Sequence, residues 1–251
     1  MSLIETEGLI LKSYALAEAD KIIVCLTQTQ GLVRGVAKGA KRLKSRFGGS
    51  LEPFTIVDLI YFQKEERELV SIRQIELKKS FFEEASDPDF LQKFSYLIDI
   101  LADFAPPHEP NERLYRMAKI CLETAAAEPQ NLNSIAFYFE IWLLRLAGYL
   151  PFWDKCDNCG RVLAEREAAG LQLNFHLLCQ NCQKSRGGIM VSPEERHIFT
   201  HSQTVAPDIF IKFAADKIGQ VREVSNILKK IIAHILGKES VGERVMIAEN
   251  F

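Results

Sequence analysis

The sequence lacks the short motifs that mark the common catalytic sites. It contains no Gly-x-x-x-x-Gly-Lys-Ser/Thr phosphate loop and no Gly-x-Ser-x-Gly nucleophile turn. His197 and His201 have the spacing of a zinc-protease helix, but Ile198 follows the first histidine where the general base would stand. We therefore expect a protein that is not an enzyme, and we interpret the two histidines as exposed helix residues.

Targeting signals and long apolar runs are also lacking. The opening MSLIETEG has two acids and no apolar centre, so we expect neither a secretory signal nor a transit peptide. The most apolar stretch, residues 135–153, is interrupted by Glu140 and Arg145 and is too polar for a membrane span. These absences predict a soluble, cytoplasmic protein without a membrane partner.

The chain has little net charge, −2 over 251 residues, but its charges are unevenly distributed. Residues 1–80 carry 13 Lys and Arg against 10 Asp and Glu, so the excess of acids lies in the remainder. The hydrophobic fraction of 47% is ordinary for a globular protein. A polyanionic partner is therefore expected to meet the N-terminal part.

One segment of the N-terminal part is strongly basic. Residues 31–49 read GLVRGVAKGAKRLKSRFGG, and no carboxylate neutralises their cations, which are Arg34, Lys38, Lys41, Arg42, Lys44 and Arg46. Such a local concentration of charge predicts a nucleic-acid-binding loop. Phe47 is the aromatic residue best placed to stack on bases, although a core position is an equal interpretation. A loop that only keeps its charges in water is the alternative for the whole segment.

The first 80 residues have the pattern of a small β-barrel. Short apolar runs rich in β-branched and aromatic residues occur at 9–11, 21–27, 32–38, 54–62 and 69–77. Turns are expected at 18–20, 28–31 and Lys64–Glu68. Five short strands in so little chain favour a five-stranded OB-fold barrel.

From Ser86 onward the apolar period becomes that of helices. Ser86-Asp87-Pro88-Asp89 predicts a helix start with Ser86 as the capping residue, and Pro106 ends that helix. Ser192-Pro193-Glu194-Glu195 is a complete capping box for a later helix. Further helices are expected at about 111–128, 132–147 and 208–215 and through 221–235. The helix at 132–147 is apolar on nearly all sides, which predicts the buried centre of a bundle capped by Gly148.

Four of the six cysteines form two Cys-x-x-Cys pairs separated by 19 residues, Cys156 with Cys159 and Cys179 with Cys182. Two such turns can surround one tetrahedral ion with four thiolates, which predicts one structural Zn²⁺ with no open position for water. Unrelated buried cysteines, a redox dithiol and His176 as a substitute ligand are the alternatives. The remaining cysteines, Cys25 and Cys121, are expected in the core.

These observations predict an α+β protein of three parts. Residues 1–80 form an OB-fold nucleic-acid-binding domain, and residues 151–188 form an inserted zinc-binding module. Residues 81–150 and 189–251 together form an α-helical domain.

In this order the features resemble the RecO family of bacterial DNA repair proteins. The resemblance covers the whole chain and rests on residues 6–14, 18–24, 31–49 and 148–160. It implies an N-terminal OB-fold, a helical domain and an inserted zinc module. It also implies a recombination mediator that binds single- and double-stranded DNA and anneals complementary strands. Such proteins work with RecR and help to load RecA onto gaps coated by the single-stranded DNA-binding protein, whose C-terminal tail they recognise. The implied location is the cytoplasm, at the nucleoid during repair.

An interpretation from another class stays open at this point. The chain would be a zinc-stabilised protein–protein adaptor whose basic segment contacts an acidic protein, without direct DNA binding. That interpretation predicts weak or no affinity for bare oligonucleotides.

Overall fold

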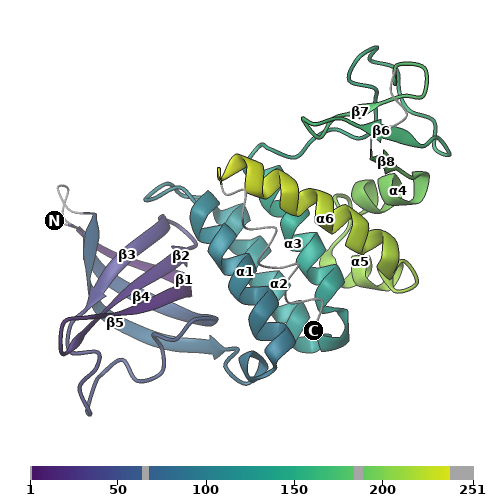
Figure 1. Ribbon diagram of the computed structural model, residues 1–251. Coiled ribbons are helices and arrows are strands. Elements are labelled where there is room, and N and C mark those ends of the chain that lie inside the picture. The colour runs from purple at the N-terminus through teal and green to yellow at the C-terminus, as the bar shows by residue number, and fades with distance from the viewer. Residues whose placement is uncertain (1, 64–67, 184–188, 238–251) are drawn as a thin grey trace. The chain divides into compact units, whose positions relative to one another are not determined.

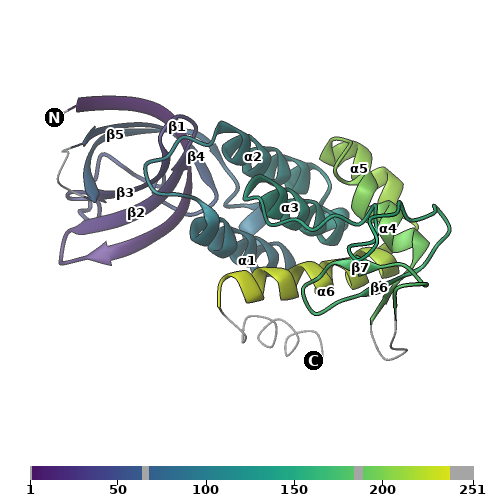
Figure 2. The ribbon, with the colours of Figure 1, turned by 90° about the horizontal axis from the view of Figure 1, so that it is seen from above.

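The computed structural model describes residues 2–63, 68–183 and 189–237, drawn as coloured ribbons in Figures 1 and 2. Residues 64–67 of the predicted turn lie outside the described part, as do residues 184–188 of the predicted zinc module and 238–251 of the predicted helical domain. The chain divides into two units, Met1–Leu132 and Asn133–Phe251.

Within the described residues, five strands of the first unit close into a barrel (Figure 1). They are β1 (Ser2–Leu16), β2 (Asp20–Thr27), β3 (Gly31–Ala37), β4 (Thr55–Gln63) and β5 (Leu69–Ser80). Around the ring the order is β1-β2-β3-β5-β4, with β3 and β5 parallel and the other neighbours antiparallel. A five-stranded barrel of this kind is the OB architecture, so the predicted α+β fold with its N-terminal barrel is confirmed.

Strand β1 is much longer than the predicted run at 9–11. Its first half, Ser2–Ile10, pairs with β4, and its second half, Gly8–Leu16, pairs with β2. Glu5 and Lys12 interrupt the apolar pattern because they lie on the outer face, which water reaches. The apolar run therefore marked only the part of the strand that is buried on both faces, where Leu9, Ile10 and Leu11 are at most 1% exposed.

Alternate side chains of the five strands fill the interior of the barrel. Ile10, Ile23, Cys25, Leu59 and Tyr61 are completely buried there. Cys121 on the second helix is also completely buried. Burial raises the pKa of the thiols of Cys25 and Cys121. The prediction that both cysteines are core residues is confirmed.

Two helices complete the first unit, α1 (Pro88–Phe104) and α2 (Glu112–Ala127). The residue that caps α1 is Asp87, whose Oδ1 accepts from the backbone N–H groups of Asp89 and Phe90 at 2.8 and 3.1 Å. The prediction that Ser86 is the cap is wrong. Ser86 ends a short 3₁₀ turn, and its hydroxyl donates backwards to the Glu83 carbonyl.

Glu7 on β1 connects three elements of the first unit. Its Oε1 accepts from the Tyr115 hydroxyl and from Lys119 Nζ of α2, each at 2.7 Å, and its Oε2 accepts from Lys78 Nζ of β5 at 2.7 Å. Burial raises the pKa of the Glu7 carboxyl, but the hydrogen bonds from Lys119, Lys78 and Tyr115 outweigh burial and hold it at about 2. The ionised carboxylate therefore stabilises the packing of α2 on the barrel.

Replacing Glu7 with Gln is expected to lower the free energy of unfolding at neutral pH by about 3 kcal/mol, the equivalent of a pKa held near 2 instead of its ordinary 4.5. Because the folded-state pKa is depressed, this stabilisation is complete above about pH 4.5 and is lost as the pH falls towards 2. Urea unfolding followed by circular dichroism from pH 7 to pH 3 measures both effects. Glu5→Gln, an exposed change on the same strand, should alter neither, and an unchanged pH profile in Glu7→Gln would contradict the assignment.

The second unit is built around α3 (Leu132–Leu146), whose residues Ile135, Phe137, Ile141, Leu143 and Leu144 are completely buried. The helices α4 (Pro193–His201), α5 (Pro207–Ala214) and α6 (Ile218–Ile235) follow it in the same unit. The predicted central helix is therefore confirmed.

Contacts along α3 join it to the later helices of its unit. The Phe137 ring stacks on Phe210 of α5 with centroids 5.4 Å apart, and Ser225 of α6 donates a 2.7 Å hydrogen bond to Glu140. Gly148 has the positive φ of 79° expected of a residue that ends a helix. Among the helices of the described residues, none is both long and apolar enough to cross a bilayer.

The capping box of α4 is also confirmed. The Ser192 hydroxyl accepts from the Glu195 N–H at 3.2 Å, and the Glu195 carboxylate accepts from the Ser192 N–H at 2.7 Å. This box fixes where α4 begins, directly after the cysteine-containing segment.

Candidate metal centre and nucleic-acid interface

The basic loop, defined as the connection between β3 and β4 at residues 38–54, carries most of the predicted cations (Figure 1). Arg34 lies on β3 itself, Lys38 follows the end of that strand, and Lys41, Arg42, Lys44 and Arg46 lie farther along the loop. All six side chains are exposed. Within the described part of the chain, none of the six forms an ion pair with a carboxylate. Their charges therefore face solvent.

Buried side chains and backbone hydrogen bonds hold the basic loop. Phe47 and Leu51 are 2% and 1% exposed and belong to the barrel core. The Lys41 N–H donates to the Ala19 carbonyl at 2.9 Å. The Gly39 N–H donates to Asp20 Oδ1 at 2.8 Å, which joins the loop to the start of β2. The loop thus presents its cations from a fixed base.

The ring of Phe47 does not face solvent, so the interpretation of Phe47 as a core residue is the correct one. The Arg46 guanidinium lies 4.9 Å from the centroid of the ring and covers it. The hypothesis that Phe47 stacks on bases is therefore wrong. Glycines and cations surround Phe47 in the sequence, so the local pattern gave no sign that the loop folds back into the barrel.

The four paired cysteines of the second unit come together in space, as predicted. Their Sγ atoms all lie within 4.8 Å of one another, and those of Cys159 and Cys179 are 3.9 Å apart. Four thiolates at 2.3 Å from one tetrahedral zinc ion are about 3.8 Å apart, so small side-chain movements fit these donors to one ion. The cluster is therefore able to hold a metal ion. His176 is not one of its members, and its Nδ1 lies 3.4 Å from an Asp157 carboxylate oxygen.

Tight turns bring each cysteine pair together. The Gly160 N–H donates to the Cys156 carbonyl at 2.8 Å, and the Cys182 N–H donates to the Cys179 carbonyl at 3.0 Å. A small sheet supports the turns and consists of β6 (Ala169–Leu171), β7 (Leu177–Leu178) and β8 (Met190–Val191). The two loops thus face each other from adjacent parts of one module.

Backbone donors favour the metal-binding form of Cys156. The Cys179 N–H donates to Cys156 Sγ at 3.3 Å. Burial raises the pKa of the Cys156 thiol, but the N–H groups of Cys179, Cys159 and Asn158 outweigh burial and lower it to about 6. A thiolate is the form that binds a metal ion.

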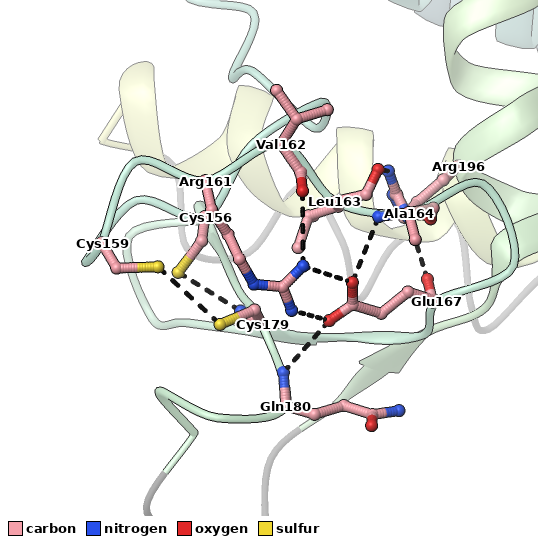
Figure 3. A network of polar contacts seen from close by, with 10 residues as sticks. All are labelled: Cys156, Cys159, Arg161, Val162, Leu163, Ala164, Glu167, Cys179, Gln180 and Arg196. Atoms are coloured by element: carbon pink, nitrogen blue, oxygen red, sulfur yellow. Dashed lines mark hydrogen bonds and ion pairs between the residues drawn. The ribbon is translucent and has the colours of Figure 1, made fainter.

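A polar network fixes the cysteine module to α4 (Figure 3). Arg196 of α4 is 8% exposed. Its Nε donates to the Trp153 carbonyl at 3.1 Å, and its Nη1 donates to the Ala164 and Glu167 carbonyls at 2.9 Å each. The Trp153 ring stacks on Phe199 of α4 at 4.2 Å between centroids.

Glu167 is the acidic member of this network (Figure 3). Its carboxylate forms a two-point contact with the Arg161 guanidinium and accepts from the Ala164 and Gln180 N–H groups at 3.1 and 3.4 Å. The hydrogen bond from Arg161 is the main reason that the pKa of Glu167 is lowered to about 2. No spacing rule connects Arg161, Glu167 and Arg196, so the sequence alone did not identify them.

The two helix histidines contact each other and a phenylalanine. The ring centroids of His197 and His201 are 6.0 Å apart, and His201 lies 4.1 Å from the Phe213 ring. His197 is exposed as predicted, whereas His201 is only half exposed because Phe213 of α5 covers one side. Neither belongs to the candidate metal cluster found among the described residues.

The chain was also compared with known protein families. Residues 1–81 match the family described as Recombination protein O N terminal, and residues 86–242 match Recombination protein O C terminal.

Individual relatives are similar to long parts of the chain. The DNA repair protein RecO of Koribacter versatilis is 32% identical over 162 residues, which cover 64% of this chain and 66% of the relative. That of Caldanaerobacter subterraneus subsp. tengcongensis is 35% identical over 166 residues, 64% of each protein. The chain thus spans just under two thirds of the length of these two relatives. The DNA repair protein RecO of Clostridium novyi is 26% identical over 249 residues, which cover 92% of this chain and 96% of the relative. The chain belongs to the RecO family of DNA repair proteins.

Proposed function

We propose that this protein binds single- and double-stranded DNA through the cations of the β3 strand and the basic loop. The observation that carries the proposal is the placement of six exposed cations on and beside an OB-type barrel, without a carboxylate partner in the described residues. Barrels of this class bind oligonucleotides, and cations that neutralise phosphates provide affinity independent of base sequence. Residues 1–80 act as the DNA-binding domain in this proposal.

The proposed activity is recombination mediation without catalysis by the chain itself. Cations that contact the phosphates of two strands reduce their mutual repulsion, which favours annealing of complementary strands. Together with RecR, the protein would recognise the C-terminal tail of the single-stranded DNA-binding protein and help to load RecA onto gaps coated by that protein. The names of the relatives, DNA repair proteins, support a role in repair.

We further propose that the metal at Cys156, Cys159, Cys179 and Cys182 is one structural Zn²⁺. Four cysteine ligands complete a tetrahedral shell, so zinc would cross-link the two turns and leave no position for a reacting water. The role of the module in this proposal is therefore structural. In this proposal the module comprises residues 151–188, of which residues 153–167 contact α4, and the helical domain comprises residues 81–150 and 189–251.

Binding of fluorescent oligonucleotides across a salt series tests the proposal. If six cations contact phosphates, log K should fall with log salt at a slope of roughly −4 for a single strand and roughly −5 for a duplex. Binding is measured by fluorescence anisotropy with bare oligonucleotides. Absence of binding to either DNA would overturn the proposal and favour the adaptor, whose partner is an acidic protein.

A further inference from the structure

The pairing of the first three strands defines a row of side chains across the barrel. Tyr14 on β1 lies opposite Ile22 on β2, and Ile22 lies opposite Val36 on β3. Because directly paired residues project to the same side of a sheet, Tyr14, Ile22 and Val36 form one row, here called the Tyr14 row.

The Tyr14 row lies on the outer surface of the barrel. The residues that flank it along the strands, among them Ile23 and Ala37, point into the core. Tyr14 is 50% exposed, and Ile22 and Val36 are half-buried. The row therefore presents an open aromatic ring beside two aliphatic side chains.

The charges that border the row differ between its two ends. At the β3 end, Arg34 and Lys38 precede and follow Val36 by two residues, and both are exposed. At the β1 end, Lys12 forms an ion pair with Asp99 of α1 at 2.6 Å, so its charge is already balanced. Asp103 of α1 lies close enough to act on Lys12 as well.

This polarity suits a single strand of nucleic acid. Its phosphates are attracted to the exposed cations at the β3 border, whereas the neutral Lys12–Asp99 pair offers them no net charge at the β1 border. The bases then extend over Ile22 and Val36 towards Tyr14. Because β1 lies two strand spacings from β3, this distance is about 10 Å. Aromatic rings beside a basic track are the means by which proteins bind unpaired bases without sequence preference.

We propose that Tyr14 is a base-stacking residue for single-stranded DNA on the outer face of β1, β2 and β3. The inference rests on the proposed function and adds to it the element that recognises bases. Tyr14, which DNA can reach, takes the stacking role first expected of Phe47, which is buried in the barrel. Duplex DNA gains little from Tyr14 because its bases already stack on one another.

Tyr14→Ala is expected to reduce affinity for oligo(dT) of about 16 nucleotides by about 5- to 150-fold, the usual effect of losing one stacking contact. Tyr14→Phe keeps the ring and should bind within about twofold of the unchanged protein. Affinity for a duplex of the same length should change little, and the salt slope should stay the same because no cation is lost. Fluorescence anisotropy measures all four quantities.

Tyr149→Ala is the matched control, since Tyr149 is 53% exposed and lies in the second unit. It should leave both affinities unchanged. Equal affinity of Tyr14→Ala and the unchanged protein for oligo(dT), or an equal loss for single strand and duplex, would overturn the role of Tyr14 and leave the proposed function intact. If the unchanged protein binds no bare DNA, both proposals fail.

A second variant guards against a change in folding. If Tyr14→Ala lowers the melting temperature, Tyr14→Trp provides a direct reading, because a base stacked on the new indole quenches its fluorescence. The fluorescence that Trp142 and Trp153 contribute is subtracted using the unchanged protein. Quenching by saturating oligo(dT) supports the inference, and unaltered emission overturns it.

Discussion

Changing Lys41, Arg42, Lys44 and Arg46 together to alanine is expected to weaken binding of single-stranded DNA by roughly 600-fold at about 0.1 M salt. Each phosphate contact contributes about 0.7 to the slope of log K against log salt, so losing four of six should change the slope from roughly −4 to roughly −1.5. Arg34 and Lys38 would supply what remains. A salt series with a fluorescent oligonucleotide measures the affinity and the slope together.

A variant that loses four cations elsewhere distinguishes an effect of the basic loop on DNA binding from an effect of net charge. Arg166, Lys212, Arg222 and Lys230 are exposed residues of the second unit, and their joint replacement by alanine should leave the slope unchanged. All eight side chains are exposed, so circular dichroism should show both variants folded. Equal slopes for the loop variant and the unchanged protein would contradict the assignment and leave the loop as solvated charge.

Replacing Cys156 with Ser is expected to release the metal ion and unfold the cysteine module. Metal binding to a four-ligand structural site contributes on the order of 10 kcal/mol, and a module of this size has little core of its own to replace it. Metal analysis should show the loss, and amide hydrogen exchange should become fast across residues 154–183. Emission from Trp153, which is 2% exposed, should shift to the red as the ring leaves Phe199.

Cys121→Ser provides the matched control, because Cys121 is a buried cysteine outside the cluster. That variant should keep its metal and a protected module. If the metal is structural, Cys156→Ser should also keep the salt slope of DNA binding, since the basic loop belongs to the other unit. Loss of DNA binding on removal of the metal would contradict a purely structural role.

The strands and helices were largely predictable because their signals are local. Apolar alternation in β2 and β4 and the helical period in α3 reflect which face each element buries. The capping box at Ser192 was readable for the same reason. At α1 the local signal was ambiguous, since Ser86 and Asp87 can both cap a helix, and the preceding 3₁₀ turn decided between them.

The metal ligands were predictable because a Cys-x-x-Cys spacing encodes the turn that brings two thiols together. The polar network that holds the module was not predictable, because Arg196 contacts its carbonyl partners only after α4 has packed beside residues 153–167. The difference between Phe47 and Tyr14 had the same origin. Each is an aromatic residue near cations, and only the course of the loop and the register of β1 determine which ring is buried.

The two buried residues of the basic loop have a consequence for the entropy of DNA binding. A free loop of this length would lose conformational freedom when it ordered on a phosphate chain, and that loss would subtract from its affinity. Phe47 and Leu51 impose much of the order when the barrel folds, before any DNA is present. The loop is therefore preorganised, because much of its conformational entropy is lost when the hydrophobic core folds and not when DNA binds.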